Sequence, residues 1–201
     1  MARHGSIDAA TFALPISRVG VGQLSVVASL LGSGDSVRSP LFVSFGDEWA
    51  IGSLDEMLNY LRYFATSERL KVLRDTAPDQ RVLAWTAFWR ETDPIPSTPE
   101  HEGLRDYFNR LQQANERFRN EAASGWLTDR GRVFITLGEP DQILEQGESN
   151  QISGRGRAQI WSYYQHHLQL VFIDQTGFGH WRLTSSSDAE FERVARRERV
   201  H

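Results

Sequence analysis

Residues 125–141 constrain the fold of this chain more than any other stretch, because they combine a helix end, a strand and a turn. Gly125 is the residue type that takes the left-handed conformation at a helix terminus. Val133, Ile135 and Leu137 then fall on alternate positions, which is the spacing of a strand. The sequence Gly-Glu-Pro-Asp at 138–141 reverses the chain. The stretch therefore predicts a helix followed directly by a strand and a tight turn.

The same stretch holds the residues that we select as a candidate binding or structural motif. Trp126 is expected to bury a large area under the turn, and Thr128 and Asp129 to bond nearby backbone amides. The complete candidate set is Gly125, Trp126, Thr128, Asp129, Arg130, Gly131, Gly138, Glu139, Pro140 and Asp141.

Charged residues lie at both ends of the predicted strand, and two interpretations follow. Paired carboxylates such as Asp129 and Asp141 can bind a metal or perform acid–base chemistry when one pKa is raised. An extended run from 132 to 137 spans roughly 20 Å, so these two acids form one dyad only if the chain folds back sharply. We favour the structural interpretation, in which Asp129 bonds turn amides or an arginine and residues 139–141 are a turn.

The N-terminal part, residues 10–46, is predicted to form β-strands. Apolar and polar residues alternate over 23–30, residues 32–36 are rich in glycine and serine, and residues 40–45 form a second apolar run. A short edge strand is predicted at 11–16, where Pro15 cannot donate to a ladder. Two or three strands are rarely stable alone. These strands therefore either pack on the rest of the chain or are the tail of a β-sandwich.

The middle of the chain, residues 53–122, is predicted to be helical. Ser53 and Glu56 have capping-box spacing, Ser67 or Thr66 can cap a second helix, and a third is expected to start at Pro78. The longest helix is expected to open at Thr98 and Pro99. Its apolar stripe contains Leu104, Phe108, Leu111 and Phe118.

Residues 123–185 are predicted to form an antiparallel meander, with further strands at 142–145, 158–164, 168–174 and 180–183. Ser187 and Glu190 have capping-box spacing and begin a terminal helix over 187–199. Consecutive strands with short turns argue against a parallel, doubly wound sheet. The predicted class is α+β, with a domain over 53–201 that follows the N-terminal strands.

Composition excludes several classes of function. The chain contains no cysteine, so it has neither disulfides nor thiolate metal sites. A formal charge of −4 gives no electrostatic footprint for nucleic acid, and no apolar run is long enough to span a membrane. The first eight residues lack the apolar segment of a signal peptide. His166 and His167 are expected in a hairpin turn, and no cofactor or metal site is predicted.

Two smaller motifs allow a binding interpretation beside a structural one. Residues 88–94, Phe-Trp-Arg-Glu-Thr-Asp-Pro, place an arginine beside two acids at a helix end, which suits either an anion clamp or an ordinary solvated terminus. Residues 153–157 resemble an anion-binding loop but lack the context of a P-loop. We favour the structural interpretation for the first motif.

The run Gly-Trp-Leu-Thr-Asp-Arg-Gly at 125–131, continued by the turn at 138–141, resembles the signature of the bacterial GWxTD domain family. Residues 88–94 and the pair Trp161 and Tyr163 resemble further motifs of that family, and residues 172–179 resemble its closing hairpin. The resemblance covers roughly residues 55–185. It implies an exported protein with an immunoglobulin-like segment ahead of the domain, although this N-terminus shows no export signal. No reaction is established for the family, so the resemblance supplies no catalytic residue.

Two functions follow from these observations. The favoured one is a non-catalytic interaction or scaffold module of the cell envelope that binds an unknown protein partner, since tyrosine, tryptophan and arginine often anchor interfaces. Its compartment would be extracytoplasmic, with the cytoplasm as the alternative. The second function is a hydrolase-like enzyme or small-ligand binder that uses Asp129, Arg130 and Asp141 in a cleft between helices and sheet.

Overall fold

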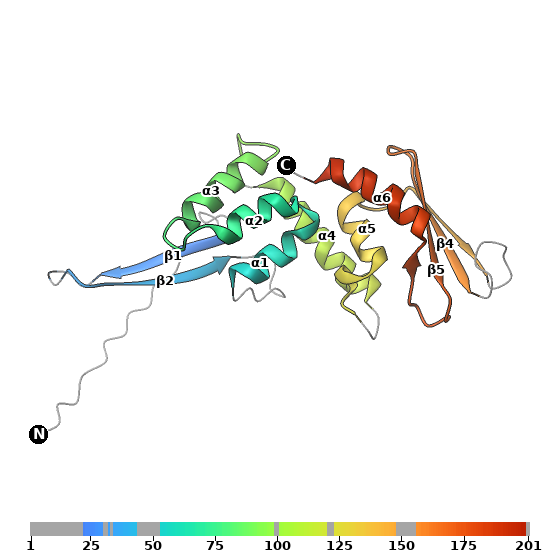
Figure 1. Cartoon of the computed structure of the whole chain (residues 1–201), viewed down its shortest axis with the longest axis horizontal. Helices are drawn as coiled ribbons and strands as arrows, with labels where there is room; N and C mark the ends of the chain where they lie inside the picture. The colour runs from blue at the N-terminus through green and yellow to red at the C-terminus, as the bar shows by residue number, and fades with distance from the viewer. Residues whose placement is uncertain are drawn as a thin grey trace, which may run out of the picture.

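The computed structural model describes residues 22–29, 32, 34–43, 53–98, 101–119, 123–147 and 156–199. A β-hairpin lies at one end of an elongated molecule, helices form the middle, and a second sheet lies at the other end (Figure 1). The predicted α+β class is confirmed. The edge strand predicted at 11–16 lies outside the described residues.

The N-terminal hairpin consists of β1 (Gly22–Ser29) and β2 (Ser36–Val43), paired antiparallel with Ser29 opposite Ser36. Gly32 and Gly34 take positive φ values in the connecting turn. The first predicted strand is confirmed, and the second begins four residues earlier than predicted. Val27 and Val37 are 49% and 72% exposed, because this end of the hairpin extends beyond the helices (Figure 1). Membership of a β-sandwich stays a prediction.

Three short helices follow, and side-chain caps fix where two of them start. Ser53 accepts a bond from the Glu56 amide at the start of α1 (Leu54–Tyr60), which continues into the 3₁₀ turn η2 (Leu61–Tyr63). Thr66 rather than Ser67 caps α2 (Ser67–Asp75). Helix α3 (Arg81–Thr92) starts three residues after Pro78, because residues 78–80 form a turn first.

Helix α4 (Glu102–Phe118) is the centre of the fold. Its predicted stripe is confirmed, because the side chains spaced three and four residues apart are buried. It starts later than the predicted Thr98 and Pro99, because the cap is His101. The buried members of the stripe are Leu104, Tyr107, Phe108, Leu111, Ala114 and Phe118.

The strand predicted over residues 133–137 is wrong: these residues belong to helix α5 (Asp129–Leu137), which follows the 3₁₀ turn η3 (Gly125–Leu127). Val133, Phe134 and Ile135 are all buried, so the helix is covered on more than one side. A short apolar run of this kind does not distinguish a buried helix from a strand. The local signals that decide for a helix are Thr128 as its N-cap and Gly138, with φ of 81°, as its C-cap.

The predicted meander is confirmed as a four-stranded antiparallel sheet, in the order β3-β4-β5-β6. Its strands are β3 (Gln142–Gln146), β4 (Arg157–Tyr163), β5 (Leu168–Asp174) and β6 (Arg182–Leu183). Helix α6 (Ser185–Glu198) starts at its cap Thr184, earlier than predicted. Ser187 is buried and accepts a bond from the Val171 amide of β5, so it ties α6 to the sheet rather than opening a capping box.

One apolar core runs through both the helical part and the sheet. Phe118 of α4 lies 5.5 Å from Phe134 of α5 and 5.6 Å from Trp161 of β4, between ring centroids. Phe172 of β5 continues this row at 4.8 Å from Trp161. Helices α4 and α5 therefore connect the sheet to the helical part, with the signature residues at their junction.

Candidate functional site

Two glycines bring the first part of the signature into close contact with its neighbours. A Cβ atom on Gly131 would overlap the carbonyl oxygen of Gly125, and one on Gly125 would overlap the carbonyl oxygen of Ala114. Thr128 joins the two glycines, since its hydroxyl donates to Gly125 O at 2.7 Å and accepts from Gly131 N at 3.1 Å. Gly125 does not take the predicted left-handed conformation. It is required for close packing on α4.

The signature tryptophan is part of the same junction. Trp126 is 7% exposed, its ring lies 5.2 Å from that of Tyr60, and the Arg62 guanidinium lies 5.0 Å from it. Asn115 of α4 accepts a 3.0 Å bond from the Gly125 amide, so this polar residue in the long helix is satisfied. Together these contacts fix η3 between α1 and α4.

Asp129 and Arg130 hold the last strand of the sheet. Asp129 accepts a 2.9 Å bond from the Leu183 amide of β6. The Arg130 guanidinium lies 5.2 Å from the ring of Phe118 and 5.2 Å from that of Trp181, so it is stacked between two aromatic rings. Burial lowers the pKa of Arg130 to about 10. Asp129 and Arg130 therefore both form contacts within the fold.

A second arginine lies against Trp181 and pairs with a buried acid. Arg157 lies 5.3 Å from the Trp181 ring and donates a 2.8 Å bond to Asp174, whose side chain is fully buried. Asp174 also accepts bonds from the amides of Thr176, Gly177 and Gly179. Burial opposes the charged carboxylate, but these donors outweigh it and lower the pKa of Asp174 to about 2.

The second part of the signature aligns β3 with β4. The Tyr163 hydroxyl donates to Gly138 O at 3.1 Å, and Asp141 accepts a 2.7 Å bond from the Tyr164 amide. Glu139 forms a two-pronged pair with Arg117 of α4, at 2.5 and 2.8 Å. Pro140 between them is buried. This turn therefore connects α4, α5 and the sheet.

The two acids of the proposed dyad lie at opposite ends of α5. A nine-residue helix is about 13 Å long, so Asp129 at its first position and Asp141 beyond its end do not share one site. Asp129 accepts the Leu183 amide of β6, whereas Asp141 accepts the Tyr164 amide in the turn after β4, and Arg130 points into its aromatic stack. None of these three residues lines either of the two grooves described next.

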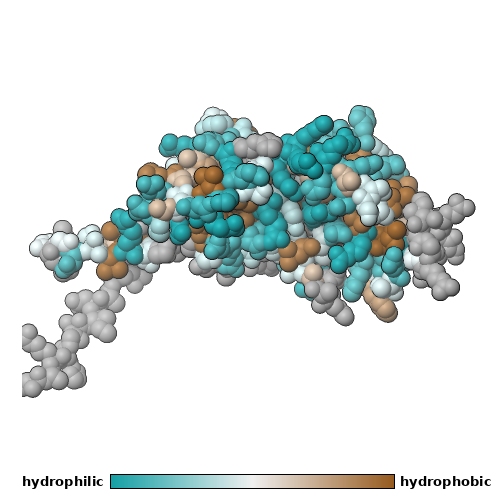
Figure 2. All heavy atoms as spheres, in the orientation of Figure 1, coloured by the Kyte–Doolittle hydropathy of each residue, from teal (hydrophilic) through white to brown (hydrophobic). Residues whose placement is uncertain are grey.

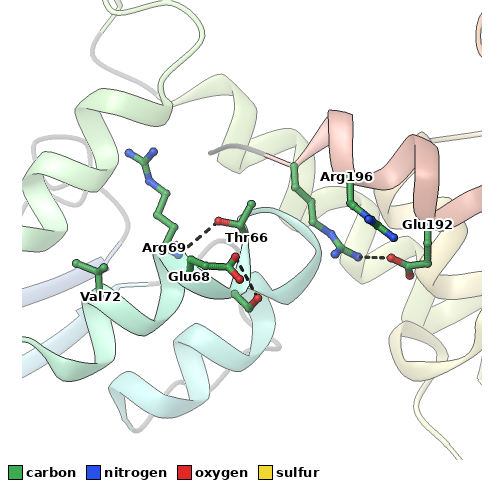
Figure 3. Close-up of a pocket in the computed structure, with 8 residues that line it drawn as sticks. Thr66, Glu68, Arg69, Val72, Glu192 and Arg196 are labelled. Atoms are coloured by element: carbon green, nitrogen blue, oxygen red, sulfur yellow. Dashed lines mark hydrogen bonds and ion pairs between the residues drawn. The ribbon is translucent and has the colours of Figure 1, made fainter.

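The first groove, of about 570 Å³, separates α2 from the C-terminal half of α6. Figure 3 shows Glu68 and Val72 on the α2 side, and Glu192 and Arg196 on the α6 side. Val72 is 66% exposed, although it is aliphatic. Arg69 also lines the groove and extends towards α3, where it pairs with Glu91. We call this feature the α2–α6 groove.

Two arginines, Arg196 and Arg199, and one acid, Glu192, line the α6 side of this groove. Arg193, Arg196 and Arg197 are exposed on the last turns of the helix. Arg199 lies 3.8 Å from Glu192, a longer contact than the 3.2 Å bond that Glu192 accepts from Arg132 of α5. The face shown in Figure 2 is strongly hydrophilic, with apolar residues in separate patches.

The second groove, of about 440 Å³, is lined by residues from η2, α4, α5, α6 and the β4–β5 turn. Arg110 of α4 lies in it, together with the aromatic residues Tyr63 and Tyr107. His166 and Glu198 also line it, with 3.9 Å between the imidazole and the carboxylate. We call this feature the Arg110 cleft.

His101 was not selected from the sequence, although it is a buried polar residue that joins two helices. Its Nδ1 accepts a 3.0 Å bond from the Leu104 amide, so the ring proton is on Nε2, which lies 2.9 Å from the Thr92 hydroxyl. Thr92 in turn donates to Phe88 O at 2.8 Å. Burial lowers the pKa of His101, which keeps the ring neutral. Trp89 also lies 4.7 Å from the His101 ring, between ring centroids. Trp89 and Thr92 of the motif at 88–94 therefore have a structural role.

The described residues give no indication of a metal site or of a membrane-spanning helix. Within the described ranges, no group of three or more histidine, aspartate or glutamate residues is placed to hold a metal ion. Among the described helices, none combines the length and the apolar character that a membrane crossing requires. His167 has a φ of 48° in the β4–β5 turn, where both adjacent histidines were predicted.

Comparison with known proteins gives one match. A family model described as the GWxTD domain matches residues 41–177, which is more than half of the 201 residues. The matched region runs from the end of β2 to the turn after β5 and includes the whole signature. Neither the curated proteins nor the solved structures compared with the chain gave a match.

Proposed function

The chain belongs to the GWxTD domain family, and from this premise we propose that it is a non-catalytic protein-interaction module whose binding face is the α2–α6 groove. The observation that carries the proposal is an open groove lined by an exposed aliphatic residue of α2, Val72, and by arginines at the end of α6. Arginine and apolar residues are the types that commonly contribute most to binding at interfaces.

The charges of the groove favour an acidic segment of a partner protein. Three arginines and two acids line the groove, and Arg69 among them is paired with Glu91, so Arg196 and Arg199 on the α6 side carry the positive charge that a partner would meet. A partner carboxylate can compete for Arg199, whose contact with Glu192 is long. Complementary charge would orient the partner and make association weaker at high salt.

The proposed location is the bacterial cell envelope, outside the cytoplasm, where the module would act as a scaffold. This part of the proposal rests on resemblance to exported GWxTD proteins. The helices described here include none that could cross a membrane.

A hydrolase-like function at the signature has less support. Asp129 and Asp141 each accept a backbone amide, at opposite ends of α5, and Arg130 is stacked between two rings. A catalytic acid–base pair needs both groups within reach of one substrate. The bonds of these residues instead favour a role in holding the fold.

Photo-crosslinking tests the proposed binding face. We would place a photoreactive amino acid at position 72, in cells that make the protein, and expect one discrete adduct with another protein. Position 83 is the matched control, because Leu83 is also an exposed aliphatic residue (74% exposed) but lies on α3. Arg196→Glu should abolish the adduct at position 72. Equal adducts from both positions, or an adduct that is insensitive to Arg196→Glu, would contradict the proposal.

A further inference from the structure

We infer that the Arg110 cleft is a binding site for the carboxylate group of a small organic acid. This site is separate from the α2–α6 groove and does not depend on the proposed interaction function. A volume of about 440 Å³ is within the range of small-molecule sites. Five elements of the fold contribute to its walls, so the site is a product of the folded domain rather than of one local motif.

Arg110 has donors that the protein does not use. Its two bonds are both 3.4 Å long and go to carbonyl oxygens, those of Asp106 and Thr136. No carboxylate in the described part of the chain forms an ion pair with it. A guanidinium has five N–H donors in a planar fork that matches a carboxylate, so most of its hydrogen-bonding capacity remains for a ligand.

Burial makes this lack of a counterion significant. The surroundings of Arg110 lower its pKa, chiefly because burial disfavours the charged form. Asp106 and Glu198 oppose this lowering electrostatically but form no ion pair with the half-buried guanidinium, so a directly bonded anionic ligand would stabilise its charged form. The bond to Thr136 O places the guanidinium at the C-terminal end of α5, where it also satisfies one of the last carbonyls of that helix. This 3.4 Å bond to Thr136 O uses only one donor of the guanidinium, so it does not explain why Arg110 lines a cleft.

The walls and rim indicate what kind of anion fits. The rings of Tyr63, Phe64 and Tyr107 line the cleft, and the Tyr107 hydroxyl already donates to Tyr60 O, so Tyr107 offers its ring more than its hydroxyl. The exposed lining is more polar than apolar, so these rings suit a small acid with a flat ring rather than a large apolar ligand. Glu198 at the rim adds negative charge, which disfavours a doubly charged phosphate more than a singly charged carboxylate.

Ligand-induced thermal stabilisation tests this assignment on the full chain. Benzoate should raise the melting temperature of the wild type, whereas benzamide, which has the same shape without charge, should not. Arg110→Gln should lose most of the response, reducing the affinity at least tenfold. Arg105→Gln on the same helix is the matched control, because Arg105 is exposed and does not line the cleft. It should respond like the wild type.

Several outcomes of the thermal-stabilisation experiment would overturn the inference. If benzoate leaves the wild type unchanged, or stabilises Arg110→Gln equally, the cleft is not a carboxylate site. Tighter binding of inorganic phosphate than of benzoate would overturn the choice of carboxylate. If Arg110→Gln does not fold, Arg110→Lys keeps the charge but loses the planar fork, and it should bind benzoate more weakly than the wild type. Equal affinity in that variant would also count against the site.

Discussion

Arg130 of the signature and Arg196 of the α2–α6 groove are in opposite environments. Arg130 is enclosed by Phe118 and Trp181, and its neighbour Asp129 bonds a strand amide. Arg196 is exposed and lines an open groove together with the exposed side chain of Val72. The most recognisable residues of the chain are therefore part of its internal structure. The surface available to a partner is formed by residues that match no motif.

The structural role of the signature and the recognition of a partner therefore concern different parts of the molecule. A recognisable signature in this chain marks a junction between α4, α5 and the sheet, which needs particular residues at close contacts. Recognition of a partner requires an accessible surface, and the surface that we propose for it is the groove between α2 and α6 (Figure 1). The comparison predicts that substitutions in the signature change stability, whereas substitutions in the groove change binding.

Gly131→Ala should have the largest effect. The added methyl group would overlap the Gly125 carbonyl oxygen, a backbone atom that cannot move without displacing η3 from α4. We expect a loss of about 4 kcal/mol or more in the free energy of unfolding, or no folded protein. Denaturant unfolding measures this loss. Gly147→Ala is the control, because nothing lies within 4 Å of a Cβ atom there. Similar stabilities of the two variants would show that the close contact is not required.

Asp174→Asn should destabilise the fold by about 2–4 kcal/mol at neutral pH, because it leaves Arg157 without its partner and weakens several amide bonds. The effect should depend on pH. The pKa of Asp174 is 3.8 when unfolded and about 2 when folded, so its contribution is complete above pH 4. It falls by about 2 kcal/mol as the pH drops through 2.

The measurement for Asp174 is the difference in unfolding free energy between wild type and variant from pH 2 to pH 6. Taking the difference removes the contributions of other acids, such as Glu139, whose pKa is lowered by its bond to Arg117. The difference should shrink below pH 4. A constant difference over this range would mean that Asp174 is not ionised in the folded protein.

Asp129→Ala should cost about 1–3 kcal/mol, because it removes the acceptor of the Leu183 amide and weakens the attachment of β6. Asp129→Asn keeps an oxygen acceptor and should cost less. Thermal unfolding of both variants measures the effect. If neither variant changes the melting temperature, the acid is not needed for the fold, and the signature becomes the place to search for a ligand.

Sequence periodicity predicted the parts of the fold whose apolar residues repeat regularly over a long range. The stripe of α4 and the alternation of β5 are of this kind. Helix α5 was predicted as a strand because its apolar residues are few and it is buried on several sides. Thr128 and Gly138 are residue types that cap helices, whereas the alternation of Val133, Ile135 and Leu137 is typical of a strand, so the local signals conflict.

The candidate sites were harder to predict than the fold. The signature residues form contacts at the junction of α4, α5 and the sheet, but the separation of Asp129 from Asp141 depends on α5 being a helix, which the sequence pattern did not predict. The two grooves join segments that are distant in sequence, and their residues, such as Val72 and Arg110, follow no local pattern. His101 was missed for the same reason, since only tertiary packing makes it a buried cap.

Arg196→Glu combined with Val72→Asp should have the smallest effect on stability, and it tests the other side of the comparison. Both side chains are exposed, so the free energy of unfolding should change by no more than about 0.5 kcal/mol, although the charge and polarity of the groove are altered. The same variant should lose the crosslinked adduct with its partner. Unfolding and crosslinking are measured on one preparation, so a folded protein that no longer binds supports the proposed face. A large loss of stability would place these residues with the signature, as part of the structure rather than of a binding surface.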